Sequence, residues 1–215
     1  MLASSCWVNP NEAESLRRLY RGRTVWLASD SPRRREILSQ CGIRHRIVSH
    51  SLDEPPPHGP DWRAWVRRWS MRKATNAAKR VHSGIILAAD TIVVRGQTGL
   101  GKPHDAAAAT AMLRMLSGRV HQVYTGVAMI DTHTSRRASG SAISHVHFRR
   151  LGDAEITRYV RSGEPLDKAG AYAIQGEGGR LVDRIEGPLD NIIGLPSGCV
   201  ERLTRRLLVP RRTSS

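Results

Sequence analysis

Lysine, phenylalanine and acidic residues are scarce in this chain of 215 residues, and long apolar runs are absent. No apolar stretch approaches the roughly 20 residues that cross a bilayer, so we expect no membrane-spanning helix. The amino-terminal segment lacks the hydrophobic core of a secretory signal, and Glu12 and Glu14 break the acid-poor pattern of a transit peptide. We therefore expect a soluble protein with no contact to a membrane.

Cysteine is also sparse, with three residues that lie far apart in the sequence: Cys6, Cys41 and Cys199. An odd number at such spacing predicts neither a disulfide framework nor a zinc site. A reducing compartment is the usual location of such a chain, so we expect a cytoplasmic protein.

The shortage of acidic residues leaves a formal net charge of +15, from 34 basic and 19 acidic side chains. Such a charge allows nucleic acid or polyphosphate ligands as partners. The basic residues are spread over the whole chain, however, and one Phe and four Tyr leave little for a base-stacking platform. A diffuse basic surface is the favoured interpretation, and a nucleic-acid partner is not expected.

Four of the 34 basic residues are lysines, and the other thirty are arginines. A chain so biased toward arginine can be expected to keep lysine where a compact ammonium is needed. Chance is the alternative explanation, but Lys73, Lys102 and Lys168 all fall within the motifs described below.

Alternating strand and helix patterns predict an α/β protein with a mixed sheet. We expect a single domain over residues 23–208. Residues 1–22 are expected to form an N-terminal extension, and residues 209–215 a disordered tail. The extension has a pattern for a short helix around 11–20. Strands are expected at 24–28, 43–49, 85–94, 120–131 and 141–151, and helices at 32–41, 61–81, 105–116, 153–161 and 197–208, with a glycine-rich segment at 163–196.

The strongest chemical signal is the turn that follows the first of these strands. Ser29 ends the apolar run, Ser31 stands at an N-cap position, Pro32 suits the first helical position, and three arginines follow at 33–35. Free backbone amides, a helix dipole, hydroxyls and guanidinium groups together make a phosphate site. The alternative is a capped surface helix, but arginine at that position opposes the dipole.

Asp90 is the strongest candidate for a catalytic residue. It lies inside the apolar strand 85–94, where a carboxylate is costly unless a cation, a metal or several donors compensate it. Thr91 would point to the opposite face. The alternative is an aspartate at a strand end, but four apolar or β-branched residues follow it, which favours a functional role.

Lys73 lies on the apolar stripe of the helix expected at 61–81, with three tryptophans on the same face. Two interpretations are equally good. The lysine either extends to water past the apolar surface or lies where the helix meets a cleft.

Three further patterns are weaker. Residues 96–102 fit the glycine and lysine spacing of a phosphate-binding P-loop, but Pro103 replaces the required Ser or Thr, so we do not expect one. His145 and His147 share one face of a strand and are interpreted as ordinary strand residues. Asp53 and Glu54 are ordinary loop charges or hard oxygen ligands for Mg²⁺.

Taken together, the motifs resemble those of the Maf-like nucleoside triphosphate pyrophosphatases, from about residue 24 to residue 207. The resemblance implies a mixed, elongated, twisted sheet with packed helices and two lobes around a central cleft. It also implies hydrolysis of a nucleoside triphosphate to the monophosphate and pyrophosphate with a divalent metal (Mg²⁺ or Mn²⁺), and a possible homodimer. The segments that carry the resemblance are Leu27–Arg34, Ala89–Thr91, Gly101–Pro103, Met112–Gly118, His121–Val127, Asp167–Tyr172, Ile174–Gly176 and Gly194–Pro196.

The same resemblance assigns roles to individual residues. Asp90 matches the acceptor of the proton from the attacking water, and Asp53, Glu54 and Asp90 match the metal side. The positions that match substrate-binding residues are Ser29, Arg33, Arg34, Lys73, Lys102 and Lys168. The specificity positions Arg33, Thr91 and Gln175 resemble the branch that prefers dTTP and UTP.

Phosphoanhydride cleavage needs neutralised phosphate charge and an aligned water, which cations and a carboxylate can supply. Two alternatives stay open at this point. One is the same chemistry on another nucleotide, such as CTP or 7-methyl-GTP, and the other is a basic nucleic-acid-binding protein with an idle site.

Overall fold

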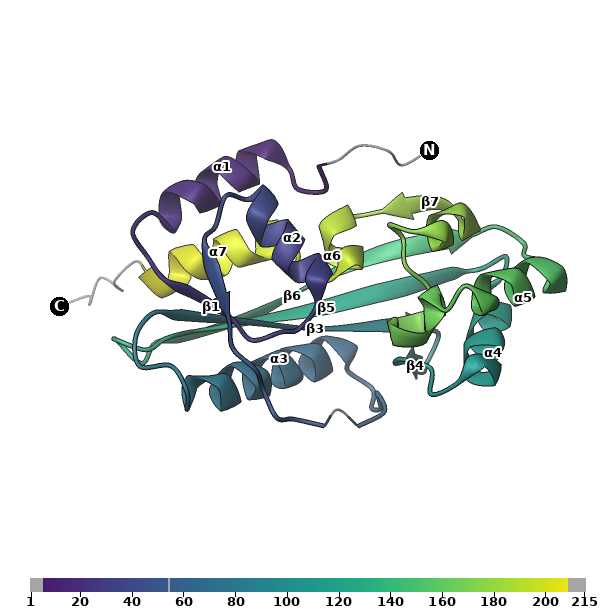
Figure 1. Cartoon of the computed structure of the whole chain (residues 1–215), viewed down its shortest axis with the longest axis horizontal. Coiled ribbons are helices and arrows are strands. Elements are labelled where there is room, and N and C mark those ends of the chain that lie inside the picture. Colours follow the sequence, from purple (N-terminus) through teal and green to yellow (C-terminus); the bar gives the residue numbers. More distant parts are fainter. Residues whose placement is uncertain (1–5, 54, 209–215) are drawn as a thin grey trace.

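The computed structural model describes residues 6–53 and 55–208, which form a long twisted sheet covered by helices on both faces (Figure 1). The sheet has seven strands in the order β2-β1-β3-β5-β6-β7, and β4 pairs with β3 away from this path. β1 is parallel to its neighbours β2 and β3, and the other pairs are antiparallel. The strands are β1 (Val25–Leu27), β2 (His45–Ile47), β3 (Ile85–Arg95), β4 (Thr98–Leu100), β5 (Val120–Asp131), β6 (Arg137–Phe148) and β7 (Val182–Glu186).

The helices divide between the two faces and one end of the sheet. α1, α2, α6 and α7 lie on one face, α3 lies on the other, and α4 and α5 form a second lobe at one end, as Figure 1 shows. The predicted mixed sheet with two lobes is therefore confirmed. The helices are α1 (Pro10–Leu19), α2 (Pro32–Gln40), α3 (Trp62–Ala78), α4 (Ala106–Leu116), α5 (Asp153–Arg161), α6 (Leu189–Ile193) and α7 (Ser197–Leu208).

β3 is apolar almost throughout because both of its faces are covered. Ile85, Leu87 and Ala89 contribute to the larger core under α1, α2 and α7. Ile86 and Ala88 contribute to a smaller core under α3. This alternation places Asp90 on the α3 face and Thr91 on the opposite face, as the strand pattern predicts.

α3 approaches the sheet closely at Gly126 of β5. A Cβ atom at Gly126 would lie 2.2 Å from the carbonyl oxygen of Val66, so only a glycine permits this contact. Gly126 is also the register partner of Asp90 across the β3–β5 ladder. The close approach therefore brings α3 over the strand position that carries Asp90.

One edge of β3 is open in its middle. β1 pairs with Ile85–Leu87 and β4 pairs with Val93–Arg95, so within the described part of the chain residues 88–92 have no strand on that side. The edge that carries Asp90 and Thr91 therefore lies between β1 and β4 and is covered by neither strand.

Several elements differ from the sequence-based expectation. β4, β7 and α6 were not predicted, because their short segments lie in turns or in the glycine-rich stretch 163–196. β4 lies within residues 96–102, so that segment is part of a β-hairpin and does not form a P-loop. The helix expected around 11–20 is confirmed as α1, whose buried Leu16 belongs to the larger core.

Among the helices in the described ranges, none combines the length and the apolar character that a membrane span requires. The expected tail 209–215 lies outside the described residues.

Candidate active site

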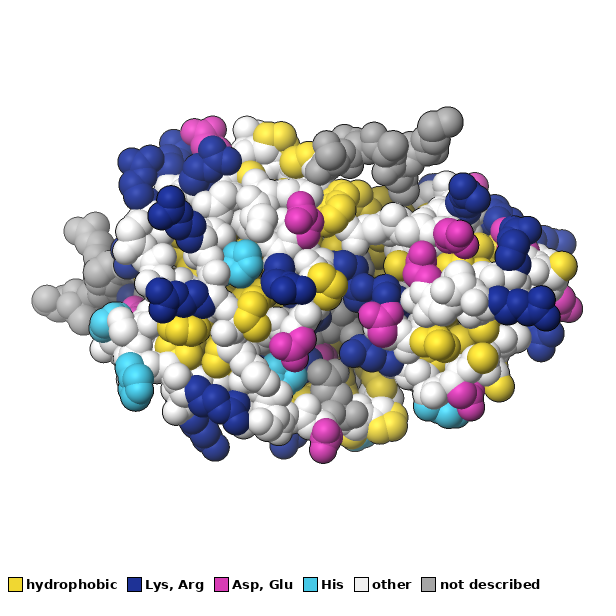
Figure 2. Space-filling view, in the orientation of Figure 1, with side chains coloured by type: hydrophobic (Ala, Val, Ile, Leu, Met, Phe, Trp, Pro, Cys, Tyr) yellow, Lys and Arg dark blue, Asp and Glu magenta, His cyan; other side chains and the backbone are white. Residues whose placement is uncertain are grey.

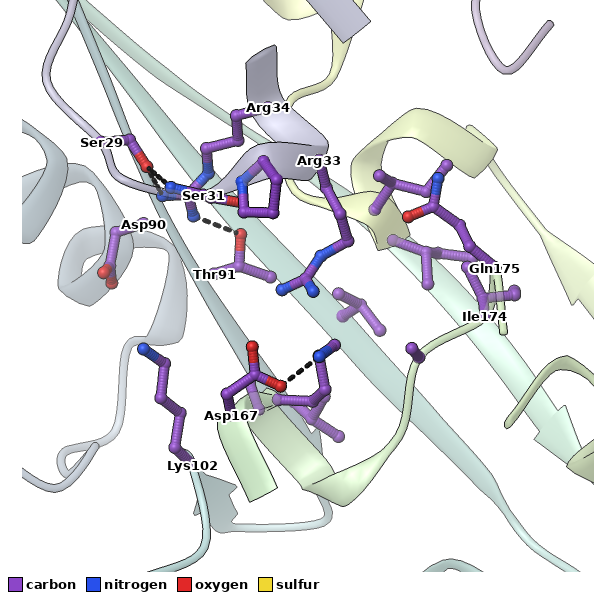
Figure 3. Close-up of a pocket in the computed structure, with 18 of the residues that line it drawn as sticks. Ser29, Ser31, Arg33, Arg34, Asp90, Thr91, Lys102, Asp167, Ile174 and Gln175 are labelled. Carbon is purple, nitrogen blue, oxygen red and sulfur yellow. Dashed lines mark hydrogen bonds and ion pairs between the residues drawn. The ribbon is translucent and has the colours of Figure 1, made fainter. Parts of the chain in front are cut away.

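A cleft of about 310 Å³ opens at the free edge of β3. Its walls come from the β1–α2 turn, from β3, and from the 167–175 segment that belongs to the second lobe (Figure 3). It gathers most of the sequence-predicted site residues, which are Ser29, Arg33, Arg34, Lys73, Asp90, Thr91, Lys102, Lys168 and Gln175.

Asp90 and Lys73 form a buried ion pair at one end of this cleft. The Lys73 Nζ atom donates to Asp90 Oδ1 at 2.7 Å, and each residue is 3% exposed. Of the two interpretations of Lys73, the one that extends it to water is therefore wrong. A buried carboxylate needs a compensating cation, and α3 supplies it from the face that the helical phase predicts.

Arg34 joins three segments around the cleft. Its guanidinium donates to Ser29 Oγ at 2.9 Å, to Thr91 Oγ1 at 3.2 Å and to the carbonyl of Gly194 at 2.9 Å. Gly194 ends α6 with a φ of 120°, a backbone conformation that glycine adopts readily. Arg34 thus fixes the β1–α2 turn relative to β3 and α6, which makes it a positioning residue.

The hydroxyl of Thr91 leads into a buried polar chain behind the cleft. Thr91 Oγ1 lies 3.0 Å from Thr125 Oγ1, and Thr125 donates to the carbonyl of Asn191 at 2.9 Å. The Asn191 side chain donates in turn to the Val123 carbonyl and to Ser144 Oγ. Thr91 is therefore held in place by Arg34 on one side and Thr125 on the other, and it lines the cleft itself.

Arg33 and Asp167 approach each other across the middle of the cleft (Figure 3). Burial lowers the pKa of Arg33, while the charges of Asp167 and Glu164 act in the opposite direction. Although burial raises the pKa of Asp167, the Lys168 ammonium that donates to it and the charge of Arg33 lower the pKa below its usual value. Asp167 is thus a charged anchor between two cations.

The first turn of α2 is less fully capped than the sequence suggests. Ser31 occupies the N-cap position, but its side chain makes no capping hydrogen bond, and its own amide donates to Ser29 Oγ at 3.3 Å. Amide donors of this turn are therefore left to bind an anion in the cleft. Lys102 extends from the opposite wall toward Asp90 (Figure 3).

The other end of the cleft is more apolar. Ile174 lies there beside Gln175, which is an exposed residue, and Ile192 and Ile193 also line the cleft. Figure 3 places Gln175 and Ile174 at the opposite side of the view from Asp90 and Lys102. The cleft thus has a charged end and an end that presents Ile174 and the amide of Gln175.

The predicted metal ligands are only partly brought together. Asp90 lines the cleft, Asp53 is exposed and is not part of the cleft wall, and Glu54 lies outside the described residues. Within residues 6–53 and 55–208, no three His, Cys, Asp or Glu side chains cluster as a metal cage. His145 and His147 contact Gln122 and Glu186 respectively, as ordinary strand residues do.

Sequence reasoning missed four polar residues of the cleft, namely Asp30, His50, Asp167 and Tyr172. Asp30 and Asp167 lie inside segments that carried the family resemblance, so a closer study of those segments could have found them. His50 follows β2, whose carboxyl end lies beside that of the parallel strand β1. The rule that sites form at the carboxyl ends of parallel strands would have indicated His50.

Comparisons with known proteins agree with this geometry. The family described as "Maf-like protein" matches residues 24–207. A protein of Myxococcus xanthus (strain DK1622) named dTTP/UTP pyrophosphatase is 47% identical over 184 residues, which are 86% of this chain and 92% of that protein. A protein of the same name from Pelotomaculum thermopropionicum is 41% identical over 174 residues, 81% of this chain and 91% of that protein.

Among solved structures, the Ham1 protein of Staphylococcus aureus superposes with a TM-score of 0.44 at 15% identity. The superposition covers 86% of this chain and 98% of that protein, and it is a loose one.

Proposed function

Because this chain belongs to the Maf-like protein family, we propose that it hydrolyses dTTP and UTP to the nucleoside monophosphate and pyrophosphate. The proposal makes it a house-cleaning nucleotide pyrophosphatase. The two relatives compared above carry the name of that activity, and this chain covers 92% and 91% of their lengths.

The observation that carries the proposal is the position of Asp90. A carboxylate on the open edge of a buried strand shares one cleft with Arg33, Lys102 and Lys168, and Lys73 compensates its charge. A structural aspartate would not need such a gathering of cations around an open cavity. A reaction on a polyanionic substrate does need it.

In the proposed mechanism, Arg33, Lys102 and Lys168 neutralise the phosphate chain, and the first-turn amides of α2 bind phosphate oxygens. Asp90 accepts the proton of the attacking water while a P–O bond forms and the phosphoanhydride bond breaks. Lys73 holds the carboxylate in position from behind. Gln175 can donate one hydrogen bond to a pyrimidine and accept one from it.

We further propose that Mg²⁺ or Mn²⁺ enters with the nucleotide. The donor set fits such an ion, because Mg²⁺ is commonly held by one or two carboxylates together with substrate phosphates. Of the three predicted ligands, Asp90 lines the cleft and would contribute a carboxylate, and Asp53 and Glu54 remain predictions. When bound, the metal would neutralise phosphate charge and lower the pKa of a coordinated water.

The substrate is tested with a panel of triphosphates. We expect pyrophosphate release with dTTP and UTP at the highest kcat/KM, measured at steady state in the presence of Mg²⁺. A preference for CTP would support the proposed hydrolysis but assign it to a different base. A preference for a purine nucleotide would contradict the proposed specificity.

The catalytic role is tested with Asp90→Asn. Loss of a positioned general base lowers kcat by about 10² to 10⁴-fold. Asp153→Asn, an exposed residue on α5 outside the cleft, is the matched control and should retain activity. Hydrolysis that survives Asp90→Asn would reject Asp90 as the base, and absence of hydrolysis in the unaltered protein would favour a nucleic-acid-binding protein with an idle site.

Two smaller proposals accompany this one. Nucleotide substrates and three free cysteines favour the cytoplasm. A homodimer stays a prediction from the family resemblance.

A further inference from the structure

A second hollow, of about 640 Å³, lies at the amino end of β1, the end opposite to the cleft. It is bordered by the end of α1 with the turn that follows, by the start of β1, and by the loop from α2 to β2. None of its lining residues belongs to the cleft. We call it the arginine hollow, because Arg17, Arg21, Arg23, Arg44 and Arg46 line it.

The charge of the arginine hollow is of one sign. Its lining contains five arginines and no aspartate or glutamate. Some arginines elsewhere on the described surface pair with carboxylates, as Arg114 does with Asp153 and Arg205 with Glu201. Within residues 6–53 and 55–208, no carboxylate forms an ion pair with any of the five.

Three of the five arginines are fixed by contacts that use only part of the guanidinium. Arg17 lies against Gly42, where a Cβ atom would meet its Nε at 2.6 Å. Arg23 donates from Nε to the carbonyl of Leu19 at 3.2 Å, and the guanidinium of Arg46 lies 5.5 Å from the centre of the Trp26 ring. A guanidinium has five N–H donors, so each keeps several for a ligand.

The end of α1 accounts for part of this charge. Arg17 lies in its last turn and Arg23 donates to the carbonyl of Leu19, its last residue, which is a common use of basic residues at a helix C-terminus. Arg21 and Arg44 have no such task, since neither makes a hydrogen bond from its side chain within the described residues. The hollow therefore has more positive charge than the helix end requires.

Figure 2 shows Lys and Arg side chains gathered over the end of α1. Trp26 is already covered by Arg46, and the hydroxyl of Tyr20 is bonded to Thr204 in the core. The hollow thus offers guanidinium forks and little aromatic surface for a base. Such forks match phosphate oxygens in pairs.

We propose that the arginine hollow is a second anion site, which binds the phosphate chain of a compact polyphosphate. Three of its arginines come from residues 17–23, which precede the family match at residue 24. The site therefore depends on the N-terminal extension of this chain and is independent of the hydrolytic cleft.

Isothermal titration calorimetry with inorganic tripolyphosphate tests the site in a full-length background of Arg33→Gln with Lys102→Gln, which weakens binding in the cleft. We expect one binding event in this background. Adding Arg21→Gln with Arg44→Gln should weaken it by at least about tenfold, because two charged hydrogen-bonding groups are lost.

The matched control is Arg63→Gln with Arg161→Gln, two exposed arginines outside the hollow. It removes the same net charge and should change the affinity by less than about twofold, because exposed charges at a distance are screened. Arg21→Lys with Arg44→Lys keeps the charge without the fork and should give an intermediate loss. In the otherwise unaltered chain, Arg21→Gln with Arg44→Gln should leave dTTP hydrolysis and the melting temperature unchanged.

Three results would overturn the proposal. One is absence of binding in the cleft-deficient background. Another is equal weakening by the hollow pair and the control pair, which would assign binding to net charge alone. The third is binding of an oligothymidylate without terminal phosphates that is lost in Arg21→Gln with Arg44→Gln, while tripolyphosphate does not bind. That result would assign the hollow to nucleic acid.

Discussion

Asp90 and Lys73 are the two residues on which the cleft most depends. Their ion pair joins α3 to β3 and is almost fully buried, at 3% exposure for each residue. A buried pair adds little stability compared with apolar residues, but a buried charge that has lost its partner is strongly destabilising. The pair is therefore better explained by the position it gives the carboxylate than by its contribution to stability.

This leads to a prediction for Lys73→Met, which leaves Asp90 without its lysine. The free energy of unfolding should fall by about 3–5 kcal/mol, and adding Asp90→Asn should restore much of it. Lys79→Met, exposed at the end of the same helix, should change it by less than about 0.5 kcal/mol. Chemical denaturation measures all four proteins, and a double variant no more stable than Lys73→Met would contradict the prediction.

The buried imidazole of His121 leads to a prediction of how the free energy of unfolding depends on pH. It is 1% exposed, its Nε2 lies 2.9 Å from the Tyr172 hydroxyl, and burial, with a smaller effect of His147, lowers its pKa from 6.5 to about 3. Below pH 6.5 the imidazole of His121 binds a proton in the unfolded chain but stays neutral in the folded protein. The folded state should thus lose up to about 1.4 kcal/mol per pH unit as the pH falls from 6.5 toward 3.

The measurement is urea unfolding at a series of pH values. His121→Gln should remove this part of the pH dependence, and the exposed His82→Gln should retain it. Equal slopes for His121→Gln and the unaltered protein would show that the buried imidazole is not the cause.

Among the elements, α3 and β5 determine how closely Lys73 approaches Asp90. Gly126 allows the backbone of α3 to lie directly on β5, and its register partner is Asp90. Any larger residue would lift the helix and move Lys73 away from the carboxylate.

Gly126→Ala is therefore expected to cost about 1–3 kcal/mol or more of stability, because a Cβ atom would lie 2.2 Å from a backbone oxygen. It should also lower kcat, because Lys73 shifts. Gly152→Ala, where a Cβ atom meets nothing within 4 Å, should cost less than about 1 kcal/mol and leave kcat unchanged. Thermal melts and steady-state kinetics of both variants test this prediction. Equal losses of stability and of kcat in Gly126→Ala and Gly152→Ala would contradict the role of Gly126 in the contact between α3 and β5.

At the scale of the whole molecule, the N-terminal segment is packed as part of the core. Leu16 of α1 is 1% exposed, Tyr20 bonds to Thr204 of α7, and Ser15 donates to Glu201 of α7. Glu12 of α1 and Asp190 both bind the Ser197 hydroxyl at the start of α7. α1 therefore supports α6 and α7, and through Gly194 it supports Arg34 in the cleft.

Leu16→Ala should accordingly destabilise the protein by about 2–5 kcal/mol, the cost of a cavity in a core. Leu19→Ala, on the same helix but only half-buried, should cost clearly less. Denaturation midpoints test this, and a negligible effect of Leu16→Ala would mean that α1 is a dispensable addition to the fold.

The sequence alone determined which residues face inward. Strand period placed Asp90 and Thr91 on opposite faces, and helical period placed Lys73 within an apolar stripe. The turn at residues 29–34 could be predicted because cap, proline and arginine chemistry are local. These signals depend on neighbours within a few positions, which a sequence records directly.

Only the tertiary structure decided which inward-facing residues contact one another. The pairing of Lys73 with Asp90, the bonds of Arg34 to Thr91 and Gly194, and the pairing of β7 with β6 all join residues far apart in the chain. The arginine hollow arises in the same way, from a turn and a loop that share no motif. The periodicity of apolar residues indicates which side chains are buried. It does not indicate which residues they contact, because those contacts follow from the packing of the whole sheet and its helices.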